Sequence, residues 1–111
     1  MREISFAKRW EKLEEPEFTT FRMQRRDKDW QLGERVKVVY HARQKDREVL
    51  GIADIVRMEE VDLKLITLNE AVGDGFQSVA EMVTWLLEVH GARLKQVPLH
   101  KLTLQYLVAR K

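Results

Sequence analysis

Four short segments rich in β-branched, aromatic or alternating apolar residues constrain the fold of this chain more than any other feature. They lie at residues 18–23, 36–41, 49–58 and 99–107. In the second segment Val36, Val38 and Tyr40 recur at every other position, which is the period of a half-buried β-strand. Gly51, inside the third segment, indicates a bulge or a close approach of the backbone. These segments predict a sheet.

The clearest helical signal runs from Ser78 to His90. Ser78 is a favourable N-cap residue, and Glu81 stands three positions later, as in a capping box. Apolar residues follow at helical spacing, and Gly91 supplies a stop. We expect a helix over residues 78–90.

Two further helices are predicted closer to the N-terminus. Phe6, Trp10 and Leu13 are spaced at i, i+4 and i+7, which favours a helix that ends before Pro16. A short helix is expected over residues 67–71, capped by Thr67. Strands with helices inserted among them predict an α+β fold, a small β-barrel with flanking helices.

Length and composition bound the remaining possibilities. The chain has 111 residues and shows no repeat or long linker, so residues 1–111 are expected to form a single domain. The absence of Cys excludes disulfides, Cys-based zinc sites and thiol catalysis. The three His residues lack the spacing of a metal motif, and no phosphate-binding glycine motif is present, so no metal or cofactor is expected.

Targeting signals are also not visible in the sequence. No apolar run approaches the roughly 18 residues of a membrane span, and charged residues interrupt the N-terminal stretch before any long apolar segment. We therefore expect a soluble, cytoplasmic protein with no membrane partner. The high charge and scarce Asn and Ser fit either a thermophile's surface or an ordinary charged small protein.

A basic cluster follows the first strand-like segment. It holds four cations within seven residues, namely Arg22, Arg25, Arg26 and Lys28. Guanidinium groups bind phosphates, and the flanking Phe21 and Trp30 could stack on unpaired bases, which indicates an RNA contact. The alternative is a solvated loop whose two aromatic residues belong to the core.

A second group of polar residues is spread along the chain. Thr20 and Arg22 are two residues apart in a predicted strand, so both point to one face of the sheet. Asp74, in the Gly73-Asp74-Gly75 turn, would meet them if a helix packs over that strand. A hydroxyl, an arginine and a carboxylate in one cleft can bind a polar base or support hydrolysis. The structural alternative is a strand Thr, a surface Arg and a turn Asp.

The order of short motifs along nearly the whole chain resembles the ASCH domain family of the PUA-like superfold. The motifs that carry the resemblance are Ile4-Ser5-Phe6, Arg9-Trp10, Phe18-Thr19-Thr20-Phe21-Arg22, Leu32-Gly33-Glu34-Arg35-Val36, Val49-Leu50-Gly51-Ile52-Ala53, Leu65-Ile66-Thr67 and Gly75-Phe76, followed by the helix over residues 78–90 and a last strand. The resemblance implies a small β-barrel with flanking helices, a cleft between them, and RNA binding.

Some members of this family are amidohydrolases that act on acetylated cytidine-like nucleosides through a Lys, a Thr and a Glu. In the family pattern Gly-x-Lys-x-x-Thr-x-Arg, Thr20 and Arg22 match, whereas Glu15 replaces the Gly and Glu17 replaces the Lys. Asp74 would stand for the family's Glu. A carboxylate at Glu17 does not replace an ammonium, so Lys8 or Lys12 would have to supply the amine.

Taken together, the residues and the resemblance predict a module that binds RNA, single-stranded or in a loop, or a nucleotide. The basic residues Arg22, Arg25, Arg26 and Lys28 would contact phosphate, and Thr20 and Asp74 would line a cleft for the base. The alternatives are a small amidohydrolase, with Thr20 and Asp74 as catalytic residues, and a protein-interaction module.

Overall fold

The fold is that of a computed structural model, which describes residues 1–8, 10–25, 28–91, 93 and 98–107. The described residues form five strands, two α-helices and two short 3₁₀ helices: β1 (Arg2–Phe6), η1 (Glu11–Glu14), β2 (Glu17–Met23), β3 (Arg35–Tyr40), β4 (Glu48–Val61), η2 (Leu63–Leu65), α1 (Leu68–Gly73), α2 (Val79–His90) and β5 (Leu99–Tyr106). The α+β class predicted from the sequence is confirmed.

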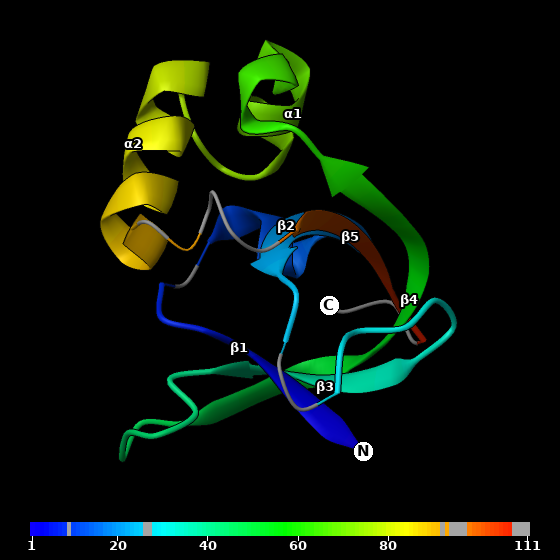
Figure 1. Ribbon diagram of the computed structural model, residues 1–111. Helices are drawn as coiled ribbons and strands as arrows, with labels where there is room; N and C mark the ends of the chain where they lie inside the picture. The colour runs from blue at the N-terminus through cyan, green and yellow to red at the C-terminus, as the bar shows by residue number, and fades with distance from the viewer. Residues whose placement is uncertain (9, 26–27, 92, 94–97, 108–111) are drawn as a thin grey trace.

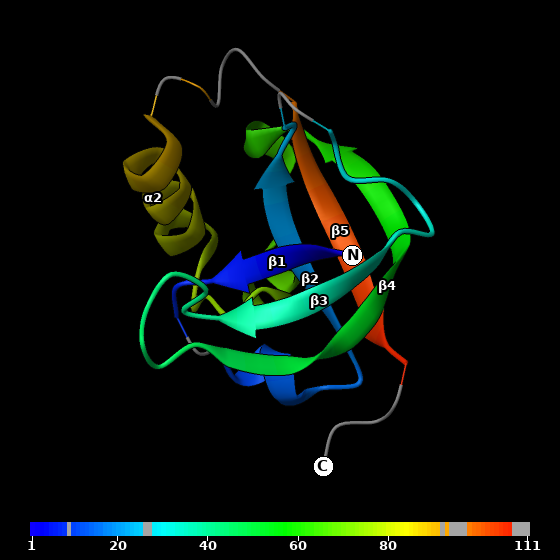
Figure 2. The ribbon, with the colours of Figure 1, turned by 90° about the horizontal axis from the view of Figure 1, so that it is seen from below.

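The five strands form one curled sheet in the order β1-β3-β4-β5-β2, with β1 parallel to β3 and the other neighbours antiparallel. Strand β4 is long because it pairs first with β3 and then with β5. The pairing register shifts between Val38 and Val39 in one ladder and between Ile55 and Arg57 in the other. Such irregularities bend a strand and increase its twist, and the sheet closes into a half-barrel (Figures 1 and 2).

Strands β1 and β2 are the two ends of this sheet and face each other across the open side of the half-barrel. The rings of Phe6 and Phe18 meet edge to face with centroids 5.9 Å apart. The guanidinium of Arg22 donates from Nη2 to the carbonyl oxygen of Ser5, over 2.8 Å. Side chains rather than backbone hydrogen bonds therefore bridge the opening.

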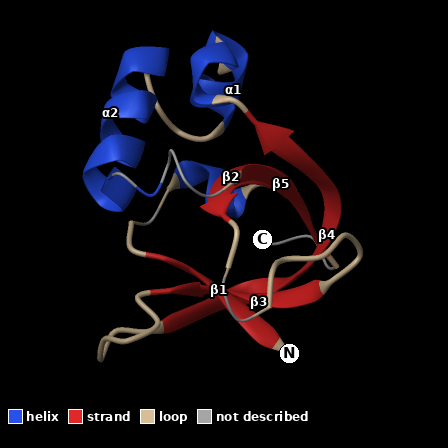
Figure 3. Ribbon diagram, in the orientation of Figure 1, coloured by secondary structure: helices blue, strands red, loops and turns tan. Residues whose placement is uncertain are grey.

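Two apolar clusters lie on either side of the curled sheet. The first fills the half-barrel with residues such as Ile4, Val38 and Leu104. The second packs Phe21 of β2 against α1 and α2, which cover one end of the sheet (Figure 3). Trp10 contacts both clusters, so the segment between β1 and β2 joins the barrel to the helices.

Both predicted N-cap residues, Thr67 and Ser78, are confirmed, but the full capping box forms only at Thr67. The hydroxyl of Ser78 accepts a hydrogen bond from the backbone N–H of Glu81 at the start of α2. At the start of α1, Thr67 and Glu70 form a full capping box. No described helix has both the length and the apolar character that crossing a bilayer requires.

The helix predicted from Phe6, Trp10 and Leu13 is wrong. Phe6 ends strand β1, where it pairs in parallel with Tyr40, and only the 3₁₀ helix η1 follows. Phe6 and Leu13 are nevertheless both buried in the barrel. Their spacing therefore reflects burial, and strand pairing determined the local structure.

Candidate functional site

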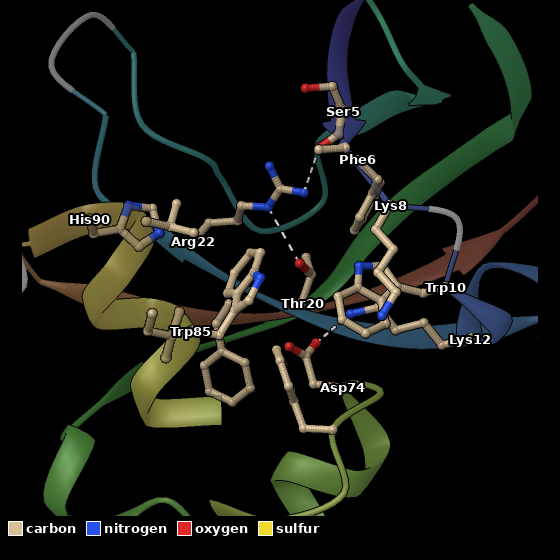
Figure 4. A pocket seen from close by; sticks show the side chains of 15 residues that line it. Ser5, Phe6, Lys8, Trp10, Lys12, Thr20, Arg22, Asp74, Trp85 and His90 are labelled. Atoms are coloured by element: carbon tan, nitrogen blue, oxygen red, sulfur yellow. Dashed lines mark hydrogen bonds and ion pairs between the residues drawn. The ribbon is translucent and has the colours of Figure 1, made fainter. Parts of the chain in front are cut away.

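A pocket of about 290 Å³ opens at the gap between β1 and β2 and reaches to the inner side of α2 (Figure 4). Its apolar walls come mainly from five aromatic residues, Phe6, Trp10, Phe21, Phe76 and Trp85. Polar side chains from four separate parts of the chain complete the lining. We call it the aromatic pocket.

Thr20, Arg22 and Asp74 all line this pocket. Thr20 and Arg22 share a face of β2, and Arg22 donates from Nε to the hydroxyl oxygen of Thr20 over 3.4 Å. Asp74 comes from the turn that caps the C-terminus of α1. The two-residue spacing in the strand and the packing of the helices therefore bring together the three residues singled out from the sequence.

Asp74 forms an ion pair with Lys12 inside the pocket, with Nζ 2.5 Å from Oδ1. Lys12 also donates to the backbone carbonyl of Thr19 over 2.8 Å. Both charged side chains are less than a tenth exposed. Burial lowers the pKa of Lys12 and raises that of Asp74, and the attraction between the two charges opposes both shifts.

The Gly73-Asp74-Gly75 turn positions this carboxylate. Gly75 has a φ of +103°, a conformation that favours glycine. A Cβ atom at Gly75 would lie 2.7 Å from Cε3 of Trp10. The turn can thus pack directly against the indole of Trp10, which holds Asp74 beside Lys12.

Three of the aromatic residues form a contiguous group at the wall. The ring centroids of Trp10 and Phe76 are 5.2 Å apart, and those of Phe76 and Trp85 are 5.7 Å apart. Trp85 remains 39% exposed, so part of this aromatic surface is available to a ligand. The ammonium of Lys8 lies 4.2 Å from the ring centroid of Trp10, which adds a positive charge at the edge of the pocket.

The charges that line the pocket are predominantly positive. Lys8, Lys12 and Arg22 face the single carboxylate of Asp74 among the lining residues. Burial lowers the pKa of Arg22 to about 10, so its guanidinium stays charged at neutral pH. Burial and the neighbouring Arg22 and Arg93 lower the pKa of His90, so its neutral form predominates at pH 7. The pocket suits a ligand that carries negative charge.

Two further residues of the predicted basic cluster, Arg25 and Lys28, do not line the aromatic pocket. Arg25 and Lys28 are exposed. The guanidinium of Arg25 lies 5.3 Å from the ring centroid of Trp30, and the carbonyl of Lys28 accepts a hydrogen bond from Arg2. Arg26 lies outside the described residues. Of the three cations in this cluster that the structure describes, only Arg22 lines the pocket.

The two aromatic residues that flank this cluster are buried. Trp30 is 4% exposed and belongs to the barrel core, and Phe21 is 5% exposed and packs against the helices. Phe21 also contributes to the lining of the pocket. The core alternative is thus confirmed for both residues.

Lys12 is the polar pocket residue that gave the weakest sequence signal. It stands in a stretch with Lys8, Glu11 and Glu14, where nothing distinguishes it from surface charge. Glu17, at the position of the family's Lys, is exposed on β2 and does not line the pocket. Lys12, which precedes Pro16 in the chain, instead places an ammonium in the pocket. This is one of the two lysines considered above as replacements.

Comparison of this chain with protein-family models, with curated proteins and with solved structures finds no match. The geometry of the pocket is therefore the basis for a functional assignment.

Proposed function

We propose that the aromatic pocket binds the base of a nucleotide, either free or unpaired in single-stranded RNA. The observation that carries this proposal is the combination, in one pocket, of an exposed aromatic surface with a buried donor–acceptor pair, Lys12 and Asp74. An aromatic surface favours a flat ring, and stacking of a base on an aromatic side chain contributes about 1–3 kcal/mol.

The buried pair fits the hydrogen-bonding edge of a base. An ammonium group has more donors than the two contacts of Lys12 use, and the carboxylate of Asp74 keeps acceptor capacity beyond its bond to Lys12. In Figure 4 the second carboxylate oxygen of Asp74 points away from Lys12, toward the side of Trp85. A ring edge that carries an acceptor next to a donor complements this arrangement, as base edges do.

Arg22 fits the phosphate of the same ligand. Its guanidinium lies at the opening between β1 and β2, beside Ser5 and above Thr20 (Figure 4). Guanidinium groups bind phosphate through several N–H donors at once. The basic loop that carries Arg25 and Lys28 follows directly after β2 and would contribute longer-range attraction.

The ASCH-type, PUA-like fold inferred from the sequence agrees with this proposal. The observed half-barrel with α1 and α2 beside it is compatible with that fold, and the pocket lies between the sheet and the helices. Fold resemblance raises the expectation of RNA binding, whereas the site itself has to supply the recognition.

The proposal is tested by titrating the four RNA nucleoside 5′-monophosphates while following tryptophan fluorescence, with calorimetry as a second readout. Trp85→Ala should weaken binding about tenfold, because the partly exposed indole supplies stacking surface. Leu87→Ala is the matched control, since Leu87 is a partly exposed apolar residue of α2 that does not line the pocket. Equal affinity in the Trp85 variant, or no binding at millimolar concentration, would overturn the proposal.

A second candidate is hydrolysis of an acetylated nucleoside. The observation that favours it is that Thr20 shares the pocket with Lys12, whose pKa burial lowers. The Thr20 oxygen would attack the acetyl carbonyl, and its proton would pass by way of the amine of Lys12 to the departing nitrogen. Water would then cleave the acetyl ester, which releases acetate and restores the hydroxyl.

Acetate release from acetylcytidine tests this candidate. Thr20→Ala should abolish turnover, and Thr20→Ser should retain part of it because the hydroxyl is kept. Absence of acetate release by folded wild-type protein would eliminate the hydrolase and leave nucleotide binding intact.

A further inference from the structure

A second hollow adjoins the aromatic pocket on the far side of the end of β1. It measures about 250 Å³ and is lined by Ser5–Ala7 and by residues 41–44 of the turn between β3 and β4. Ser5, Phe6 and Ala7 also line the aromatic pocket, so the two cavities share this segment as a wall. Figure 2 shows the turn beside the end of β1. We call this cavity the turn hollow.

Several specific contacts hold the turn that lines this hollow in place. His41 has a φ of +52°, and its backbone N–H donates to the carbonyl of Phe6 over 3.1 Å. Its imidazole nitrogens lie 3.0 Å from the carbonyl oxygen of Ala7 and 2.9 Å from a carboxylate oxygen of Asp46. The ring of Tyr40 stacks on it at 3.8 Å. These contacts fix the turn against the end of β1.

A positive charge stands on each side of the shared wall. On the side of the aromatic pocket, Arg22 is anchored to the wall through the carbonyl of Ser5. On the other side, Arg43 is exposed and lines the turn hollow, and it makes no ion pair with any residue that the structure describes. Two cations flanking a short wall suit a sugar–phosphate backbone that crosses it.

The side of the aromatic pocket that lies away from the turn hollow is less suitable for a polyanion. A third hollow of about 510 Å³ adjoins the aromatic pocket through Lys8, Trp10 and Lys12, but Glu11 and Glu15 also line it. The carboxylates there offset the two lysines. A nucleic acid strand that leaves the aromatic pocket is therefore attracted toward the turn hollow.

We propose that the turn hollow is the subsite for a second nucleotide, so that the natural ligand is single-stranded RNA rather than a free nucleotide. This inference rests on the proposed function of the aromatic pocket. One base occupies the aromatic pocket, the phosphodiester passes Arg22 over Ser5–Ala7, and the neighbouring nucleotide lies against His41 and Arg43. Because the second subsite would contact the sugar and phosphate, we expect it to show no preference for the identity of the second base.

The test compares a mononucleotide with a dinucleotide. Affinities are measured for the tightest-binding nucleoside 5′-monophosphate and for RNA dinucleotides that carry its base on either side and a terminal phosphate on the other nucleotide, so that one phosphate passes Arg22 and the other can reach Arg43. The better dinucleotide should bind the wild-type protein about tenfold more tightly, since it adds contacts in the second subsite. The affinity for this dinucleotide should fall more steeply with salt concentration in the wild-type protein than in an Arg43→Ala variant. The slope of log affinity against log salt concentration should differ by roughly 0.7, the value for one phosphate contact to single-stranded RNA.

Arg43→Ala should reduce the dinucleotide advantage to about twofold or less without changing mononucleotide affinity. Lys45→Ala is the matched control, because it removes a charge from an exposed residue of the same turn that does not line the hollow. Arg43→Gln, with thermal unfolding of each variant, guards against a folding defect.

The outcomes separate the two proposals. Mononucleotide binding with no dinucleotide advantage, or an advantage that survives in both Arg43 variants, would overturn the second subsite and leave the aromatic pocket in place. Failure of every mononucleotide to bind would contradict the proposed function itself.

Discussion

Lys12 and Asp74 lie 62 positions apart in the chain, yet their charged atoms are 2.5 Å apart in a pocket where both side chains are nearly excluded from solvent. One residue belongs to η1 and the other to the turn after α1. The pair therefore links the segment that follows β1 to the helical part of the molecule. Because taking two charges out of water has a large cost, each charge depends on the other.

This dependence predicts an asymmetry between single and double substitutions. Asp74→Ala leaves the ammonium of Lys12 buried without its partner, and we expect it to lower the free energy of unfolding by about 3–5 kcal/mol. The double variant Lys12→Met with Asp74→Leu removes both charges and should recover most of that loss. Urea unfolding measures the difference.

Arg35→Ala provides the comparison for an exposed ion pair, that of Arg35 with Asp54, and should change the unfolding midpoint very little. A double variant that is no more stable than Asp74→Ala would show that the loss comes from packing rather than from an uncompensated charge.

A second prediction concerns the contact between Gly75 and Trp10. Gly75→Ala combines an unfavourable positive φ with a Cβ atom 2.7 Å from the indole. We expect a loss of about 2–5 kcal/mol in the free energy of unfolding, together with a changed near-ultraviolet circular dichroism spectrum. Gly33→Ala is the control, since Gly33 has a φ of +83° with nothing within 4 Å of its added Cβ.

The control should cost only the backbone strain, about 1–2 kcal/mol. Equal losses in the two variants would mean that the indole of Trp10 moves aside freely and does not fix the turn.

Local patterns in the sequence predicted the elements of this fold well. The alternation of Val36, Val38 and Tyr40 and the caps at Thr67 and Ser78 depend on neighbours within a few residues. Gly51 also behaves as expected, because a Cβ there would lie 2.9 Å from the ring of Tyr106. The predicted helix through Phe6 failed because pairing with β3, more than 30 residues away, outweighed the local spacing.

In the candidate site, too, local sequence patterns predicted local geometry but not contacts between residues distant in the chain. Thr20 and Arg22 could be placed on one face from their spacing alone, whereas the ion pair of Lys12 depends on how η1 packs against the turn after α1. A charged residue in a charged stretch carries no local sign of burial. The positions of Arg25 and Lys28 outside the pocket likewise depend on how the loop packs against Trp30 and Arg2.

The capping box of α1 gives a pH-dependent prediction. Hydrogen bonding from the backbone of Thr67, and the ammonium of Lys101 at 3.1 Å, lower the pKa of Glu70 below its usual value of about 4.5. A carboxylate whose folded pKa is depressed stabilises the protein above its unfolded pKa, and this contribution is lost as the pH falls through the folded value.

The difference in unfolding free energy between the wild-type protein and Glu70→Gln should accordingly be larger at pH 7 than at pH 3. Glu17→Gln controls for the removal of one negative charge from an exposed position. If the Glu70 difference were the same at both pH values, the ionised carboxylate would have no stabilising role.

The last prediction concerns His90, which ends α2 and lines the aromatic pocket. Burial, together with the charges of Arg22 and Arg93, lowers the pKa of its imidazole below 6.5. The imidazole is thus neutral at pH 7.5 and gains a positive charge as the pH falls well below 6.5. A bound phosphate favours that charge, so nucleotide affinity should rise in acid, by about fivefold for a charge interaction of roughly 1 kcal/mol.

The measurement is the ratio of nucleotide affinities of the wild-type protein and His90→Gln at pH 7.5 and pH 5, because protonation of the nucleotide affects both proteins and cancels in the ratio. The ratio should increase toward low pH. The same protonation should also destabilise the free protein, since a histidine with a lowered folded pKa opposes folding once the unfolded chain binds protons more readily. A ratio that does not change with pH would place the phosphate out of reach of His90 at the end of α2.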